Sequence, residues 1–184
     1  NPDEVGKWFW KQALEICEKG IKQYSNSFGA SQCKSLQNQI LRKSLNIQTE
    51  QINLPNSPFL ALIEYRNVPN VYVKVVRMNE KRLEKLKEKG RGRDADVQIV
   101  DYLNSLPSSQ NSIFDLPDDG DYRKHSVEVK IDALPFGKYA VLISDNQEFN
   151  IKTGSVGYVN TTISNLGYWH RTDDQNRNEY VVYN

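Results

Sequence analysis

The 184-residue sequence has few of the residues that build metal and redox centres: two cysteines, two histidines and one methionine. Neither Cys17 nor Cys33 lies in a Cys-x-x-Cys pair or in a cysteine and histidine cluster with the spacing of a zinc site. We therefore expect neither a metal nor a cofactor. Long apolar runs are also missing. The longest, 59–63 and 139–143, fall far below the roughly 18 residues that cross a bilayer, so no membrane span is predicted.

An excess of charge of either sign is missing as well. The chain carries 24 basic and 23 acidic side chains, for a formal net charge of +1 at pH 7. Nucleic-acid-binding domains normally carry a basic excess that displaces the counterions of phosphates, so nucleic acid is not expected as a partner. The same balance predicts no polybasic membrane patch.

Hydrophobic residues are sparse at 38%, against roughly 45–50% in average soluble domains. At about 100–200 residues per domain, the length supports one domain plus a fraction of another. We expect a modest core, a polar surface and a function that composition alone does not specify.

The first 46 residues have the pattern of a helical hairpin. Asn1-Pro2-Asp3-Glu4 has the form of a helix start, with a capping Asn, Pro at the first helical position and acidic groups in the first turn. A break at 25–27 ends this helix, and Ser27 can cap a second one that reaches about Leu45. Apolar residues recur at spacings of three and four, as in amphipathic helices. The two stripes are Trp10, Ala13, Leu14, Cys17, Ile21 and Tyr24, then Cys33, Leu36, Ile40 and Leu41.

The two cysteines are predicted to lie at the same level of this hairpin. Cys17 is seven residues before Tyr24 and Cys33 is six residues after Ser27, so at about 1.5 Å per residue both lie roughly 10 Å from the turn. We predict a disulfide between Cys17 and Cys33, which implies an oxidising compartment. The alternative is that both are small buried hydrophobic residues, as is usual in cytosolic proteins.

From residue 47 to residue 150 the apolar pattern changes to a period of two, which is typical of strands. Phe59–Arg66 and Val71–Val76 are predicted to form a hairpin around the turn Asn67–Asn70. Ser126–Ile131 alternates like a half-solvated antiparallel strand, whereas Lys138–Ser144 is apolar on both faces. Further strands are expected at Glu148–Lys152, within Val156–His170 and at Glu179–Tyr183. The predicted fold is therefore mainly β, an immunoglobulin-like antiparallel β-sandwich that follows an α-helical hairpin.

The segment 79–106 interrupts the sandwich with a charged insertion. Its first part, Glu80–Lys89, carries opposite charges three residues apart and has only Leu83 and Leu86 to bury, so we expect a short exposed helix. A second short helix on the edge of the sandwich is predicted by Val97, Val100, Leu103 and Leu106. The segment 151–184 is expected to contain terminal strands that begin a following module.

The sequence contains no convincing set of catalytic residues. His125-Ser126 is the only adjacent base and nucleophile, but adjacent residues on a strand point to opposite faces. The Gly-x-Ser-x-Gly, His-Glu-x-x-His and glycine-rich phosphate-binding motifs are absent. We expect no catalytic residues and no enzyme activity.

Two acidic turns offer the hard oxygen ligands that calcium prefers. They comprise Asp115, Asp118, Asp119 and Asp121 around Gly120, and Asp173, Asp174, Asn176, Asn178 and Glu179. Tight turns need the same residue types, so we favour a turn over a metal site for both. The aromatic residues Tyr158, Tyr168 and Trp169 could stack on a sugar, although packing in a core or an interface is the preferred interpretation.

A resemblance to a known family covers most of the chain. It is carried by Asp121-Tyr122-Arg123-Lys124-His125-Ser126, continuing through Val127–Ile131 to Leu134-Pro135-x-Gly137-x-Tyr139. Upstream it includes Tyr24-Ser25-x-Ser27-x-Gly29-Ala30-x-x-Cys33 and the stretch from Pro58 to Val68. These residues resemble the macroglobulin-like domain of bacterial alpha-2-macroglobulin family proteins, particularly the Bacteroidetes type, and the stretch that precedes it.

The resemblance implies a macroglobulin-like sandwich in a protease-trap type envelope protein that is periplasmic, cell-surface or extracellular. Its partners would be neighbouring domains of the parent chain and, for the full-length protein, a target protease. Many family members carry a Cys-x-Glu-Gln thioester, but Cys17 is followed by Glu18-Lys19 and Cys33 by Lys34-Ser35, so neither matches. We therefore expect a non-catalytic scaffold or interaction fragment, with a carbohydrate-binding or adhesion module as the alternative.

Overall fold

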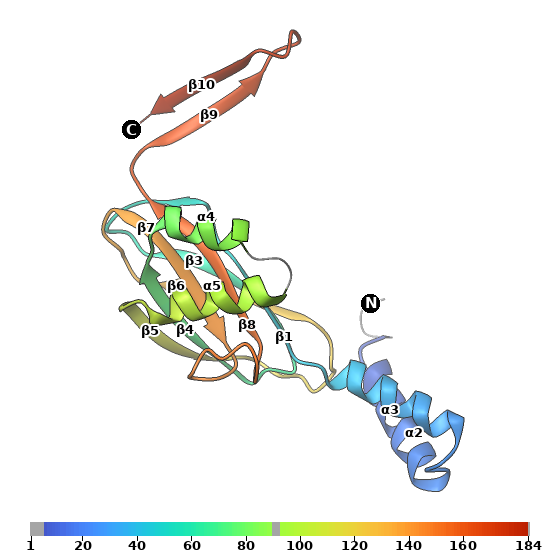
Figure 1. The fold of residues 1–184 in the computed structure, drawn as a ribbon. Coiled ribbons are helices and arrows are strands. Elements are labelled where there is room, and N and C mark those ends of the chain that lie inside the picture. The colour runs from blue at the N-terminus through green and yellow to red at the C-terminus, as the bar shows by residue number, and fades with distance from the viewer. Residues whose placement is uncertain (1–5, 90–92, 184) are drawn as a thin grey trace.

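The computed structural model describes residues 6–89 and 93–183, which form a helical hairpin, a β-sandwich and a projecting two-stranded ribbon (Figure 1). The hairpin consists of α2 (Phe9–Gln23) and α3 (Phe28–Leu41), which pack on each other. No helix in the described part of the chain is long and apolar enough to cross a membrane.

The end of the hairpin differs from the prediction, and its predicted start is not tested. The expected helix start at Asn1–Glu4 lies outside the described residues. Ser27 caps α3 as predicted, because its hydroxyl accepts a hydrogen bond from the amide of Ala30 at 3.1 Å. The second helix ends at Leu41 rather than near Leu45, because the chain there enters the first strand of the sandwich.

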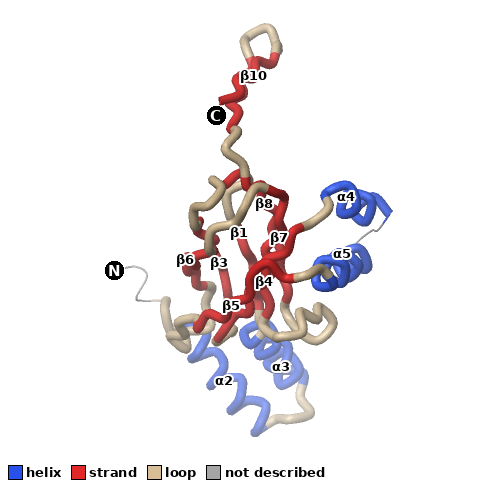
Figure 2. Tube along the Cα trace, turned by 90° about the vertical axis from the view of Figure 1, so that its left-hand side faces the viewer, coloured by secondary structure: helices blue, strands red, loops and turns tan. Residues whose placement is uncertain are grey.

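Two sheets face each other in the sandwich, which confirms the predicted fold class (Figure 2). The strand orders are β1-β3-β6 and β2-β8-β7-β4-β5, and all pairs are antiparallel except β2 with β8. The chain crosses between the sheets after β1, β2, β3, β5 and β6, and such repeated crossings are typical of immunoglobulin-like sandwiches. The strands are β1 (Ser44–Gln48), β2 (Ile52–Asn53), β3 (Phe59–Arg66), β4 (Asn70–Arg77), β5 (Ser108–Asp115), β6 (His125–Ile131), β7 (Gly137–Ser144) and β8 (Val156–Ile163).

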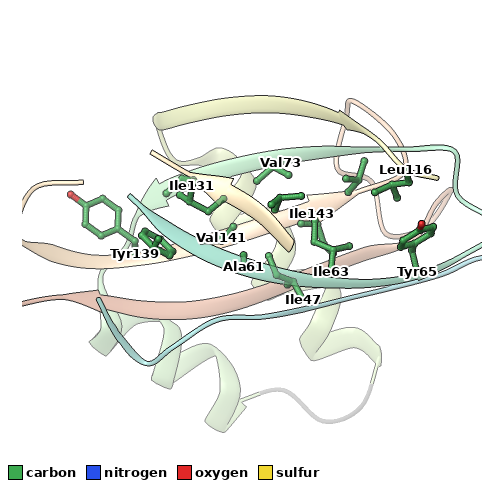
Figure 3. Packing of buried hydrophobic residues seen from close by; sticks show 14 of the residues in the cluster. Ile47, Ala61, Ile63, Tyr65, Val73, Leu116, Ile131, Tyr139, Val141 and Ile143 are labelled. Atoms are coloured by element: carbon green, nitrogen blue, oxygen red, sulfur yellow. The ribbon is translucent and has the colours of Figure 1, made fainter. Parts of the chain in front are cut away.

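The main core lies between the two sheets (Figure 3). Strands β3 and β4 bury nearly every second residue, whereas β7 is buried on both faces and turns Tyr139, Val141 and Ile143 toward this core. The buried set includes Ala61, Ile63 and Tyr65 from β3, Val73 from β4, Ile131 from β6, and Val141 and Ile143 from β7. The period of two in the sequence thus identifies the inner face of each sheet.

A tyrosine corner begins β7. The ring of Tyr139 is buried, and its hydroxyl donates a hydrogen bond to the carbonyl oxygen of Pro135 at 3.1 Å. At Gly137, an added Cβ would lie 3.1 Å from both Tyr139 Cε2 and Arg77 Nε, so glycine leaves room for the ring. The Leu-Pro-x-Gly-x-Tyr segment therefore fixes the turn that leads into a central core strand.

The predicted hairpin between β3 and β4 is wrong. β3 pairs with β1 and β6, whereas β4 pairs with β5 and β7 in the opposite sheet. Between them, Asn67 adopts a left-handed backbone conformation with φ of 55°, and Val68 is buried in the core. This turn carries the chain across the sandwich instead of back along the same sheet.

The charged insertion forms two helices that cover the outer face of the five-stranded sheet (Figures 1 and 2). They are α4 (Glu80–Lys89) and α5 (Arg93–Ser105). A second core cluster joins Leu83 of α4 and Leu103 of α5 to Ala140 and Leu142 of β7. The helices therefore cover a face rather than the predicted edge, and this explains why β7 is apolar on both sides.

The remaining strands differ from the prediction in three respects. β5 was not predicted from the sequence, and Glu148–Lys152 forms a turn rather than a strand, with Phe149 at φ 53°. β8 pairs with β7, so residues 156–163 belong to the sandwich rather than to a following module. The last two strands, β9 (Gly167–Thr172) and β10 (Asn178–Tyr183), pair with each other in the ribbon.

Candidate functional site

Cys17 and Cys33 lie side by side between α2 and α3, as their spacing predicts. Both are free thiols, so the predicted disulfide is not formed in this structure. Burial, together with the hydrogen bond and the charge of Cys33, raises the pKa of the Cys17 thiol. Bond formation needs an oxidant as well as proximity, and the pairing stays a prediction that thiol counting before and after reduction tests.

Polar side chains at the end of β3 attach the helical hairpin to the sandwich. Asn67 Nδ2 donates to the carbonyl oxygens of Ile40 at 2.7 Å and Arg42 at 3.2 Å. Arg66 Nε donates to the same Arg42 oxygen at 3.2 Å, and its guanidinium also bonds the carbonyl of Gln39. These carbonyls belong to the last turn and the C-cap of α3, where no further helical amide can reach them.

A hollow of about 630 Å³ beside this junction is lined by four cations, Arg42, Lys43, Arg66 and Lys124. Lys43 Nζ lies 3.0 Å from Asp145 Oδ2. Burial raises the pKa of Asp145, but the hydrogen bonds from Lys43 and the Ser155 amide outweigh it and hold that pKa below its ordinary value. Because Lys43 and Arg66 are both engaged, the hollow is part of the attachment between hairpin and sandwich.

His125 pairs with Asp121 rather than with Ser126. Its Nε2 lies 2.8 Å from Asp121 Oδ1, which also accepts a hydrogen bond from the Arg123 amide at 2.9 Å. Burial alone raises the pKa of Asp121, but these hydrogen bonds and the charges of His125 and Lys7 lower it below its ordinary value. The sequence reasoning missed this pair, although an Asp four residues before a His at a strand start could have indicated it.

Tyr65 is the aromatic neighbour of the Asp121 and His125 pair, but it is not an activated nucleophile. The two rings are 5.8 Å apart between centroids, and the Tyr65 hydroxyl donates to the Pro117 carbonyl oxygen at 2.6 Å. Burial and the charges of Asp118, Asp119 and Asp121 raise the pKa of Tyr65, so its hydroxyl stays protonated. The three side chains together hold the loop before β6 against the core.

The two acidic turns use their carboxylates to bind their own backbone. Asp118 Oδ1 accepts from the Gly120 amide at 2.8 Å. Asp173 Oδ1 accepts from the amides of Gln175 and Arg177, both at 2.9 Å, and its Oδ2 lies 2.7 Å from Arg177 Nε. Across residues 6–89 and 93–183, no three His, Cys, Asp or Glu side chains are grouped to hold a metal. The observed bonds support the turn interpretation.

Tyr158, one of the three aromatic residues that could stack on a sugar, packs in the protein instead. Tyr158 is half-buried and packs against the second core cluster beneath α5. Burial and the charge of Asp96 raise the pKa of its hydroxyl. The side chains of Tyr168 and Trp169 lie outside the described residues.

The ribbon of β9 and β10 is the candidate interaction site. It projects from the end of the sandwich opposite the helical hairpin (Figures 1 and 2). Tyr180 and Val182 share one face of β10 and are 63% and 66% exposed, and Val181 is exposed on the other face. Within the described strands, β9 and β10 pair only with each other, so each keeps one open backbone edge.

Cross-strand pairs hold the ribbon in register. Arg171 and Glu179 lie opposite each other and form an ion pair at 2.7 Å. The His170 and Tyr180 rings stack at 4.8 Å between centroids. The ribbon is therefore an ordered pair of strands with open edges.

No protein family and no curated protein matches this sequence. Among solved structures, the chain is similar to the CARDB domain of a Pyrococcus furiosus protein, at 10% identity over 67% of this chain and 88% of that one, with a TM-score of 0.36. It is also similar to red sea bream transglutaminase, at 11% identity over 80% of this chain but 21% of that one, with a TM-score of 0.38. Likenesses at this level assign neither a family nor a ligand.

Proposed function

We propose that this chain is a non-catalytic interaction module of a macroglobulin-like envelope protein, and that the ribbon joins it to a neighbouring domain. The observation that carries the proposal is the ribbon itself, which has two open edges and an exposed apolar face. The resemblance of residues 121–139 to the macroglobulin-like domain suggests the kind of parent protein. We also propose a target protease as a partner of that full-length protein.

The physical basis is that a two-stranded ribbon is poorly stabilised alone. An isolated pair of strands in water is at best marginally stable, and it becomes stable when a third strand or an apolar surface covers it. Open edges are also ready templates for another strand. A neighbouring domain that pairs with one edge and covers Tyr180 and Val182 would supply both a third strand and an apolar surface.

The internal bonds of the polar clusters support a scaffold rather than a catalyst. Asp121, His125 and Tyr65 are committed to one another and to the Pro117 carbonyl. Asp118 and Asp173 are committed to their turns. Each of these groups has a structural partner, which fits a module whose role is to hold and present surfaces.

The test substitutes Tyr180→Ser and Val182→Ser together in the full-length protein. We expect the unfolding temperature of the neighbouring domain to fall by several degrees, because that domain contacts the exposed face of β10. The matched control is Leu60→Ser with Ile113→Ser, which removes two exposed apolar side chains from the sandwich. An equal effect of both pairs, or none from the ribbon pair, would contradict the proposal.

A further inference from the structure

The helical hairpin carries a positive charge that the balance of the whole chain conceals. Residues 6–43 contain seven Lys or Arg and two Asp or Glu, for a net +5, whereas the whole chain is +1. Residues 1–5 carry −2 from Asp3 and Glu4, and residues 44–184 carry 17 Lys or Arg against 19 Asp or Glu, for a net −2. A small basic element is thus attached to a nearly neutral body, and the expectation of no polybasic patch does not hold locally.

The same hairpin exposes a large share of the apolar side chains that remain in contact with solvent. The exposed large apolar residues on it are Trp8, Phe9, Trp10, Ile16, Tyr24, Phe28 and Leu41. Its buried residues are few, namely Leu14, Cys17, Ala30 and Ile40. An element with so little of its apolar surface covered invites a partner.

The exposed aromatic side chains at the tip of the hairpin are the most prominent. Tyr24 and Phe28 flank the turn between the helices and are 66% and 80% exposed. Ser27 orders this turn, since its hydroxyl donates to the Tyr24 carbonyl at 2.8 Å and accepts from the Ala30 amide at 3.1 Å. The tip points away from the sandwich and from the ribbon (Figures 1 and 2).

Three lysines lie close to the tip along the two helices. Lys22 and Lys19 precede Tyr24 by two and five residues, and Lys34 follows Phe28 by six. At about 1.5 Å per residue, all three lie within roughly 10 Å of the tip along the helices. Glu18 is the one acidic residue between positions 18 and 34.

We propose that the tip of the helical hairpin docks on an anionic lipid membrane. Tyr24 and Phe28 enter the boundary between headgroups and acyl chains, where aromatic rings are favoured. Lys19, Lys22 and Lys34 extend toward the phosphate groups along their flexible stems. Residues 44–184 carry a net −2, so the positive charge of the hairpin directs this end of the molecule toward the anionic surface.

The shape of the tip favours lipid over a protein partner. Stable protein interfaces bury about 1,200–2,000 Å² in total, which two side chains on a narrow turn do not supply. A membrane needs no preformed pocket, because lipids adapt to a convex insertion. Reversible lipid binding also requires only a few apolar and basic side chains acting together.

The experiment measures co-flotation of the chain with phosphatidylcholine vesicles that contain or lack phosphatidylglycerol. We expect binding to the anionic vesicles alone, and a loss of at least about 10-fold in the Tyr24→Ser and Phe28→Ser double variant. Lys19→Gln with Lys22→Gln should weaken binding by about 5- to 25-fold. Far-UV circular dichroism verifies that each variant keeps its helices.

The matched controls are Phe136→Ser, an exposed aromatic on the sandwich, and Lys130→Gln with Lys152→Gln, two exposed cations outside the tip of the hairpin. They should bind anionic vesicles like the unmodified chain. Equal loss in controls and tip variants, equal binding to neutral vesicles, or no binding at all would overturn the proposal. A dimer that forms without lipid and disappears in the tip variants would overturn it too, by assigning the tip to a second copy of the chain.

Discussion

Tyr139 shows how one side chain connects a sequence motif to the fold. Tyr139 is buried, and its hydroxyl donates a part-buried hydrogen bond to the carbonyl of the exposed Pro135, which removal of the hydroxyl would abolish. We expect Tyr139→Phe to lower the free energy of unfolding by about 0.5–1.5 kcal/mol, measured by urea denaturation. Tyr72→Phe, on the same pair of central strands but half-buried, is the control and should change it by less than about 0.5 kcal/mol.

Asp121 gives a pH-dependent prediction. Because its native pKa is lowered, the charged carboxylate stabilises the fold above its unfolded pKa of about 3.9 and loses that effect as pH falls through the native pKa. Asp121→Asn should cost about 1–3 kcal/mol at neutral pH. The difference between the variant and the unmodified chain should shrink below about pH 4. A cost that stays constant down to about pH 2 would show that the charge plays no part.

At the level of residues, the sequence predicted what is local and missed what depends on the fold. The Ser27 cap and the turn before Tyr139 are set by a few neighbouring residues, and both are present. The Asp121 and His125 pair is only four residues apart, but its packing against Tyr65 needs a strand from elsewhere in the chain. The sequence placed the two cysteines at one level, but spacing does not decide their oxidation state.

Among the elements, the insertion helices contribute more than their charged sequence indicates. Leu103 of α5 is fully buried against the outer face of the sheet. We expect Leu103→Ala to lower the free energy of unfolding by about 2–5 kcal/mol, since it removes core atoms and leaves a cavity. Leu60→Ala, at an exposed position of β3, should change it by less than about 0.5 kcal/mol. Equal effects would mean that α5 is not part of the folded core.

The attachment of the helical hairpin rests on Asn67, which both bonds the end of α3 and adopts a left-handed backbone. Asn67→Gly keeps the backbone preference and loses the hydrogen bonds, whereas Asn67→Ala loses both. We expect alanine to be about 1 kcal/mol more destabilising than glycine in denaturant unfolding. The opposite order would show that the left-handed conformation is not required there.

The errors at the level of elements have a common physical origin. Two amphipathic strands joined by a short turn can form a hairpin in one sheet or face each other across a core, and the alternation of β3 and β4 is the same in both cases. β5 is polar at most positions because it lies at the edge of its sheet, so it lacked the apolar signal of a strand. Pairing partners, rather than strand positions, are what the sequence pattern leaves open.

On the scale of the whole molecule, the sandwich separates two projecting elements. The helical hairpin lies at one end with its basic and aromatic tip, and the ribbon lies at the other with its open edges (Figure 1). This arrangement suits a module that is held at one end and joined to a domain at the other. Composition concealed it, because acidic residues elsewhere in the chain offset most of the positive charge of the hairpin.

The most direct test of the interaction module is amide hydrogen exchange of the ribbon, followed by mass spectrometry. In the full-length protein, we expect the amides of residues 167–183 to exchange slowly, comparably to those of β7, because a neighbouring domain covers them. In the 184-residue chain alone, the ribbon should exchange rapidly while β7 stays protected. Equally rapid exchange of the ribbon in both proteins would contradict the account.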